Sequence, residues 1–159
     1  MLAKVAASLC LLSFSLPTLA ANPADLDQLR RTGNCPNCDL SYARLRGRNL
    51  QGADLRGANL NAANLRGANL SRANLTGATL NNADLTGANL TNANLTAANL
   101  LMTRLDRAIL LGTQLVNAVL GGRDRLARGR TFRDATLPNG EKAFFPFERG
   151  FAPHSPTSR

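Results

Sequence analysis

The stretch "GADLRGANLNAANLRGANL", residues 52 to 70, places Leu at four positions that are five residues apart. The same spacing continues on both sides of it, because all 17 positions divisible by five from 40 to 120 are Leu. Two positions before each of these Leu residues, Ala occupies 13 of the 17 sites. The repeat dominates this region, so it has to be explained before any other feature.

A five-residue period fits neither a helix nor a strand. Five residues of an α-helix advance by about 500°, so successive Leu side chains would spread around every side of it. On a strand, an odd spacing would send them alternately to opposite faces. A chain that turns one corner every five residues instead points each Leu at a common axis, with Ala where only a methyl group fits. The spacing therefore predicts a solenoid.

The units "ANLRGANL", "ANLTGATL" and "ADLTGANL" resemble the A-(D/N)-L-x-x unit of pentapeptide-repeat proteins. The resemblance covers residues 38–122. It implies an all-β solenoid, a right-handed quadrilateral β-helix with four pentapeptides per coil, so that residues twenty apart stack on one another. Some members of this family mimic DNA and protect topoisomerases from quinolones, which requires an acidic surface. The net charge of +9 argues against that role here.

Three local features of the repeats make specific predictions. Gly recurs every ten residues from Gly57 to Gly87, which predicts that alternate corners need a positive φ. Arg48 replaces a small inward residue, so we expect the first coil to be distorted there. Arg46 and Arg66 are twenty residues apart and should stack as like charges, which is unfavourable unless an anion or an Asp lies between them.

Residues 1–20 have the features of a secretory signal peptide. Lys4 precedes an apolar run over residues 5–16, and the segment ends on the small residue Ala20, where we expect cleavage. The alternative is an uncleaved N-terminal anchor. Cleavage would remove only Lys4 from the charged residues and change the net charge from +9 to +8. We therefore expect export to the periplasm, the thylakoid lumen or the extracellular space, with no transmembrane segment in the mature chain.

Residues 21–37 are expected to form an N-terminal helical cap. Asn22 can cap a helix, Pro23 suits its first position and Gly33 its end. These signals predict one short helix over residues 23–32, which would cover the open end of the solenoid.

Residues 123–149 are expected to form a C-terminal cap, and residues 150–159 a disordered tail. In "RTFRDATL", the five-residue spacing resumes at Phe132 and Leu137, two residues out of register. Asn139-Gly140 indicates a turn. We expect this cap to pack three aromatic side chains on the last coil, those of Phe144, Phe145 and Phe147.

Cys35 and Cys38 form the motif "CPNC" directly before the repeats. Such a pair can be a redox dithiol, half of a zinc site or a local disulfide. Zinc needs four ligands, and the only other candidate of that kind after residue 20 is His154 in the polar tail. A redox motif would open a helix of a βαβ unit, which this sequence lacks. Export favours oxidation, so a structural disulfide or an inert cap pair is the preferred interpretation.

The basic residues of the first two coils form one candidate interaction surface, represented by Arg44, Arg46, Arg66 and Arg72. It either solubilises the protein or binds anionic lipid, glycan or an acidic protein. Nucleic acid is not expected as a partner, because no aromatic platform interleaves with the arginines.

The last coil provides a second candidate surface. Outward positions that are polar earlier in the repeats become apolar at Leu101, Leu111 and Val116. Such a patch should be covered either by the C-terminal part of the chain or by a second copy in a homodimer.

Together these features predict a non-enzymatic exported scaffold or protein-interaction module with a protein partner. The single histidine makes a hydrolase-type arrangement improbable, and no cofactor, metal ion or catalytic residue is expected. The rival hypotheses are a thiol-disulfide redox protein that uses Cys35 and Cys38, and a peripheral binder of an anionic surface.

Overall fold

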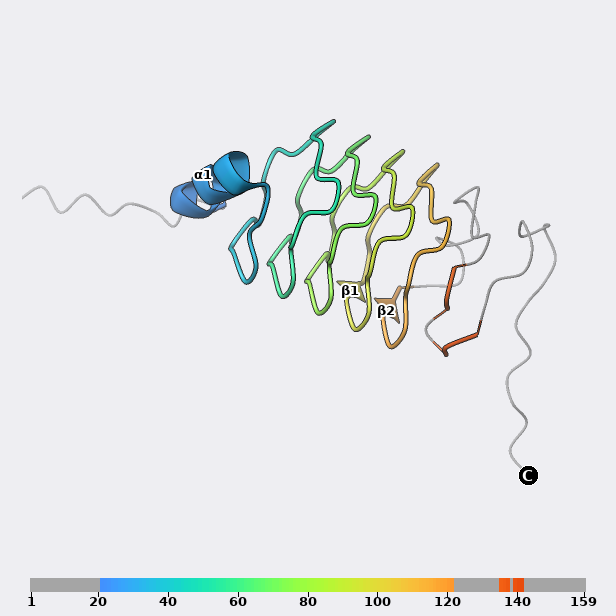
Figure 1. Cartoon of the computed structure of the whole chain (residues 1–159). Helices are drawn as coiled ribbons and strands as arrows, with labels where there is room; N and C mark the ends of the chain where they lie inside the picture. Colours follow the sequence, from blue (N-terminus) through green and yellow to red (C-terminus); the bar gives the residue numbers. More distant parts are fainter. Residues whose placement is uncertain (1–20, 122–134, 138, 142–159) are drawn as a thin grey trace, which may run out of the picture.

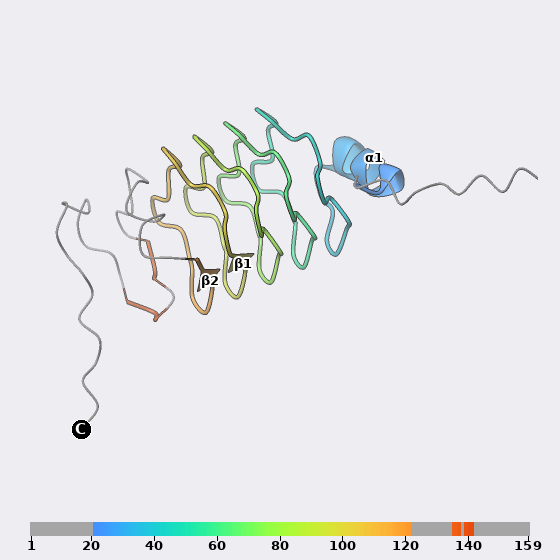
Figure 2. The same ribbon diagram turned by 180° about the vertical axis from the view of Figure 1, so that it is seen from behind.

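The computed structural model describes residues 21–121, 135–137 and 139–141. Their stacked coils form a column with one helix, α1, at its N-terminal end (Figures 1 and 2). The signal peptide, the disordered tail, and the expected packing of Phe144, Phe145 and Phe147 fall outside the described residues, and they stay predictions.

Helix α1 spans Pro23–Thr32, which confirms the predicted bounds. It begins because the side-chain oxygen of Asn22 accepts a hydrogen bond from the Ala24 N–H (3.0 Å) and because Pro23 stands at the first helical position. It ends at Gly33, whose φ of 73° is left-handed and whose N–H donates to the Leu29 carbonyl. Leu29 is the buried residue of the helix and belongs to the core cluster of the coils.

The coils form a right-handed quadrilateral β-helix, as the family resemblance implies. Residues twenty apart pair in parallel, so four pentapeptides make one coil. The longest paired strands are β1 (Asn99–Leu100) and β2 (Val119–Leu120), with Asn99 opposite Val119. The repeated Leu and Ala side chains are buried along the axis. Among the described residues, the core is therefore a single column of buried side chains along the axis.

Each corner repeats the same hydrogen bonds. The residue two positions before a Leu donates its N–H to the carbonyl of the preceding Leu, as Ala78 does to Leu75 (3.0 Å). The residue just before a Leu is usually Asn or Asp. Its side chain accepts the N–H two residues later, as Asn94 does from Thr96 (3.0 Å). Hydrogen bonds between coils add to these, for example from Leu75 N–H to Asn94 O (2.7 Å).

The prediction that alternate corners have positive φ is wrong, because every corner does. All 17 corner residues from Asn37 to Asn117, seven glycines and ten other residues, have φ between 54° and 70°. The closed turn requires this conformation at its third residue whatever the side chain is. At Gly57, a Cβ atom would also overlap the side-chain oxygen of Asn37 in the preceding coil, so the Asn37 side chain would have to move.

The expected distortion at Arg48 is also absent. The Arg48 N–H donates to Leu45 O at 3.1 Å, the same distance as from Ala53 to Leu50. Its carbonyl accepts from the Asn69 N–H of the next coil (2.9 Å). No coil precedes this position on its N-terminal side. The exposed Arg48 side chain can therefore leave the small inward slot through the N-terminal end of the column.

At the other end, residues 135–137 continue the column. Thr136 pairs with Gln114, a separation of twenty-two residues, which confirms the predicted two-residue shift of register. The Leu115 N–H donates to Thr136 O (2.8 Å), and Ala135 is buried. The predicted turn is also present, because the Gly140 N–H donates to Leu137 O (2.9 Å).

Candidate functional site

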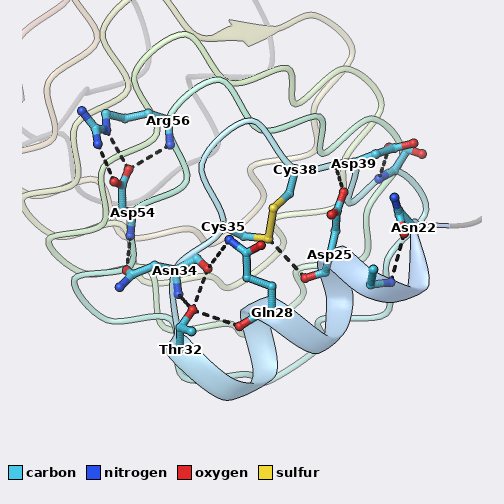
Figure 3. The surroundings of a disulfide bond; sticks show 12 residues. Asn22, Asp25, Gln28, Thr32, Asn34, Cys35, Cys38, Asp39, Asp54 and Arg56 are labelled. Atoms are coloured by element: carbon cyan, nitrogen blue, oxygen red, sulfur yellow. Dashed lines mark hydrogen bonds and ion pairs between the residues drawn. A yellow bond between two sulfur atoms is a disulfide. The ribbon is translucent and has the colours of Figure 1, made fainter.

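The disulfide between Cys35 and Cys38 lies in a corner of the β-helix (Figure 3), with an S–S distance of 2.04 Å. Cys35 occupies the position of a repeated Leu and Cys38 that of a repeated Ala. Pro36 and Asn37 form the corner, where Asn37 has a φ of 58°, and both residue types suit these turn positions. Both cysteines are buried, with exposed fractions of 0% and 5%.

The coil hydrogen bonds begin at this motif. The Cys35 N–H donates to Asp54 O and the Asn37 N–H to Arg56 O, both at 2.8 Å. The "CPNC" motif is thus an additional corner of the repeat, in which the disulfide takes the place of the Leu and Ala side chains. The predicted repeat region begins only at residue 38, because the Leu spacing alone does not include a corner that has cysteines at the Leu and Ala positions.

Two polar side chains cap the first complete coil next to the disulfide (Figure 3). The Asp25 carboxylate accepts the Asp39 N–H (2.7 Å), and the Asn34 side-chain oxygen accepts the Asp54 N–H (2.8 Å). Thr32 holds the chain in place, because its hydroxyl accepts the Asn34 N–H (3.0 Å). The sequence analysis missed both capping roles, since nothing in the repeat pattern marks residues outside the repeat.

Three of the four predicted arginines share one side of the column. Arg44, Asn64, Asp84 and Arg104 stack in one line through successive pairs. Arg46 and Arg66 stack beside this line. Arg72 belongs to a different corner and does not join them.

The same side also carries Arg104 and Arg107, which were not predicted from the sequence, although counting in steps of twenty would have found them. We call Arg44, Arg46, Arg66, Arg104 and Arg107 the arginine side.

Asp84 lies between two arginines of the arginine side, Arg66 and Arg104. No described carboxylate forms an ion pair with Arg46, so the Asp that would offset the stacking of Arg46 on Arg66 is not found between them. The Asp84 carboxylate lies 3.3 Å from a guanidinium nitrogen of Arg66 and 3.8 Å from one of Arg104. Partial burial acts to raise the pKa of Asp84, but hydrogen bonds from Thr86 and Arg66 and the charge of Arg104 lower the pKa below its ordinary value.

A second ion pair lies on the opposite side of the column, because Arg56 is ten residues, or half a coil, away from Arg46 and Arg66. Arg56 donates to both oxygens of the Asp54 carboxylate, at 2.8 Å and 2.6 Å. These side-chain hydrogen bonds lower the pKa of Asp54. Arg56 is therefore neutralised locally, whereas the arginine side keeps five arginines against two aspartates, Asp84 and Asp106.

The apolar residues of the last coil do not form one patch. Leu101 and Leu111 are ten residues apart, so they lie at diagonally opposite corners, and both are exposed. Exposed Met102 and Val119 lie on the side of Leu101. Val116 lies at a third corner and is half-buried. The predicted homodimer surface is thus spread around the coil, and the homodimer stays a prediction.

Neither a metal site nor a membrane-spanning helix is found in the part of the chain that the structure describes. No three His, Cys, Asp or Glu side chains there come together in a way that could hold a metal ion. Helix α1, with ten residues, is too short to cross a bilayer, and no other described segment forms a long apolar helix.

The family model described as pentapeptide repeats (8 copies) matches residues 38–77, 73–112 and 83–122. These matches cover more than half of the chain, which therefore belongs to the pentapeptide-repeat family. A comparison with curated proteins gives no match.

Solved structures of similar proteins include one from a plant and two from cyanobacteria. A pentapeptide repeat protein from the thylakoid lumen of Arabidopsis thaliana is 35% identical with a TM-score of 0.54, over 59% of this chain and 64% of that protein. HetL from Nostoc, involved in heterocyst differentiation regulation, is 28% identical with a TM-score of 0.33, over 69% and 64%. A Cyanothece protein is 30% identical with a TM-score of 0.37, over 62% and 91%. The chain thus spans less than two thirds of the first two proteins.

Proposed function

We propose that this protein is a non-enzymatic, exported scaffold that binds an acidic protein partner on its arginine side. The observation that carries this proposal is the filled axis. Leu and Ala side chains occupy most inward positions of the described coils, and those in the middle coils are fully buried. Cys35, Cys38, Thr103 and Thr113 take other inward positions and are buried too. A column of this kind has no internal room for a substrate, so recognition has to use the outer sides or the ends.

The arginine side is the outer surface with the strongest charge. Its five arginines stand against two aspartates, and the ladder hydrogen bonds between coils hold their backbone positions rigidly. A fixed array of like charges attracts an oppositely charged partner and accelerates its association, more strongly at low salt. A protein partner is preferred over an anionic membrane or glycan, which would be alternative outcomes of the test.

The test compares two variants of equal net charge. One carries Arg46→Gln, Arg66→Gln and Arg107→Gln on the arginine side, and the control carries Arg31→Gln, Arg56→Gln and Arg72→Gln elsewhere. Retention on immobilised poly-glutamate is measured as the salt concentration rises, with vesicles containing anionic lipid as a second probe. The first variant should elute at lower salt than the control. Equal elution of both variants would contradict recognition by this side.

The rival redox function has less support from the geometry. A catalytic dithiol needs a sulfur that its substrate can reach, and both Cys35 and Cys38 are buried at core positions of a corner. We therefore propose that the disulfide closes the N-terminal corner of the column. Turnover of a disulfide substrate by the mature protein, lost in Cys35→Ser, would contradict this assignment.

Export is supported by two observations. Residues 1–20 have the sequence features of a signal peptide, and the thylakoid lumen protein shares 35% identity with this chain. Determining the N-terminal residue of the protein purified from its source would test the proposal. An N-terminus at Ala21 supports export, whereas an intact Met1 in the cytoplasm contradicts it.

A further inference from the structure

The N-terminal edge of the first coil, which no earlier coil covers, is capped on only two of its four sides. On one capped side, the Asp39 N–H donates to Asp25 and the Asp39 carbonyl accepts from the Asn22 N–H (2.9 Å). On the other, Asp54 is satisfied in the same way by the Asn34 side chain and the Cys35 N–H. These contacts replace the coil that would otherwise precede the first one.

On the other two sides, Arg44 and Asn49 hold the equivalent positions. Neither their N–H groups nor their carbonyls form a hydrogen bond with any residue that the structure describes. One coil further on, the corresponding groups of Asn64 are paired, since its N–H donates to Ala43 O (2.9 Å) and its carbonyl accepts from the Leu45 N–H (2.8 Å). Arg44 and Asn49 thus present the edge of an unfinished β-sheet.

A hollow of about 960 Å³ lies between this open edge and helix α1. Its floor is apolar and includes Leu29, Leu45 and Leu50. Three arginines line it, Arg30, Arg44 and Arg48. No carboxylate residue lines the hollow, and none of these arginines forms an ion pair with a described residue. The hollow therefore combines apolar surface, unpaired backbone groups and uncompensated positive charge.

We propose that this open edge binds an extended acidic peptide segment of a partner protein, which adds the missing two sides of the coil by strand addition. Unpaired N–H and carbonyl groups in register are complementary to a polypeptide backbone, and strand addition is a common mode of peptide recognition. The apolar floor accepts an apolar side chain of the segment at the position of each repeated Leu.

The arginines make this edge selective for acidic segments. Charged residues on an open strand edge prevent pairing with other strands, and here every charge in the hollow has the same sign. A basic or neutral segment would leave the guanidinium groups uncompensated, whereas Asp or Glu side chains pair with them. A second copy of this chain brings the same three arginines to the contact and is repelled.

This inference rests on the proposed function only in taking the protein to be a binding protein. The site lies at the end of the column rather than along the arginine side, and Arg44 alone belongs to both. Variants at Arg30 and Arg48 therefore test the open edge, and the variants at Arg46, Arg66 and Arg107 test the arginine side.

The probe is the ten-residue peptide ADLTGADLTG, blocked at both ends, whose sequence follows the repeat unit "ADLTGANL" of this chain. Its two Leu N–H groups would donate to the carbonyls of Arg44 and Asn49, as the Leu65 N–H donates to Asp84 O within the column. The control peptide has the same sequence with both Leu amides N-methylated, so that charge and side chains stay the same while two N–H donors are replaced by N–CH3 groups.

Titration calorimetry with the mature chain, residues 21–159, should show binding of the parent peptide and at least about tenfold weaker binding of the N-methylated one. The variant Arg30→Gln/Arg48→Gln should weaken binding of the parent peptide several-fold and reduce its salt dependence. The matched control, Arg56→Gln/Arg72→Gln, lies outside both the hollow and the arginine side and should bind it like the wild type. Circular dichroism would verify that both variants fold.

Three outcomes of the binding measurements would overturn the inference. They are no binding of the parent peptide, equal binding of both peptides, and equal weakening by both double variants. End-to-end dimers of the protein in sedimentation at high concentration, with no peptide binding, would mean that copies of the chain occupy the edge and would also overturn it. Loss of poly-glutamate retention in the arginine-side variant with peptide binding intact would separate the two proposals.

Discussion

The neighbouring residues Ala97 and Ala98 should respond with opposite signs to the same substitution by Gly. Ala97 lies at an exposed corner with a φ of 56°, whereas Ala98 is fully buried on the axis. A left-handed conformation costs an L-residue about 1–2 kcal/mol, and the greater freedom of unfolded Gly costs about 0.5–1 kcal/mol. Ala97→Gly should therefore raise the free energy of unfolding by about 0.5–1 kcal/mol.

Ala98→Gly has the reverse effect. It removes a buried methyl group, worth about 0.8 kcal/mol, and adds the same cost of unfolded freedom, so the free energy of unfolding should fall by about 1–2 kcal/mol. Urea unfolding followed by circular dichroism measures both, provided that the slope of the transition is unchanged. A wild-type or lower midpoint for Ala97→Gly would refute the reasoning that the corner conformation is unfavourable for Ala.

Two further perturbations test the ends and the charges. Replacing both Cys35 and Cys38 by Ala should lower the free energy of unfolding by about 2 kcal/mol from the lost loop constraint. The double variant Cys35→Leu/Cys38→Ala, which restores the side chains of an ordinary repeat, should recover part of this loss in thermal unfolding; no recovery would contradict the assignment of both cysteines to repeat positions. The lowered pKa of Asp84 implies stability that is present above about pH 4 and lost as the pH falls further. Asp84→Asn should weaken this acid dependence in unfolding measured from pH 6 to pH 2, and an unchanged dependence would contradict it.

The sequence was sufficient to predict which side chains line the axis of the column. It was insufficient to predict the backbone conformation of the corners. Leu at every fifth position has a single geometric solution, so the stripe of buried side chains and the coil of four pentapeptides followed from spacing and family resemblance. The alternation of Gly was a misleading signal, because residues such as Ala62 and Ala97 adopt the same positive φ as the glycines. The hydrogen bond that closes each turn imposes the positive φ. The residue type at the corner only determines how unfavourable that φ is.

Surface grouping was predictable where the register alone decides it. Counting by twenty places Arg44 and Arg104 in one line and sends Arg72 to another corner, but a cluster judged by closeness in sequence includes Arg72 and leaves Arg104 out. The same count separates Leu101 from Leu111. Residues that share a side of a solenoid are far apart in the chain, so closeness in sequence predicts a shared surface poorly.

The ends of the column could not be predicted, for a different physical reason. A repeat pattern predicts the contacts and hydrogen bonds between one coil and the next. It does not predict what satisfies the backbone groups of the first coil, which no coil precedes. Asp25 and Asn34 satisfy two sides of the first coil from outside the repeat, and Arg44 and Asn49 are left open only because no described residue does the same for them. Arg48 illustrates the consequence, since a residue that would disrupt an inner coil is accommodated at the end. In a column whose axis is filled, the ends are the places where the repeat leaves backbone groups available for recognition.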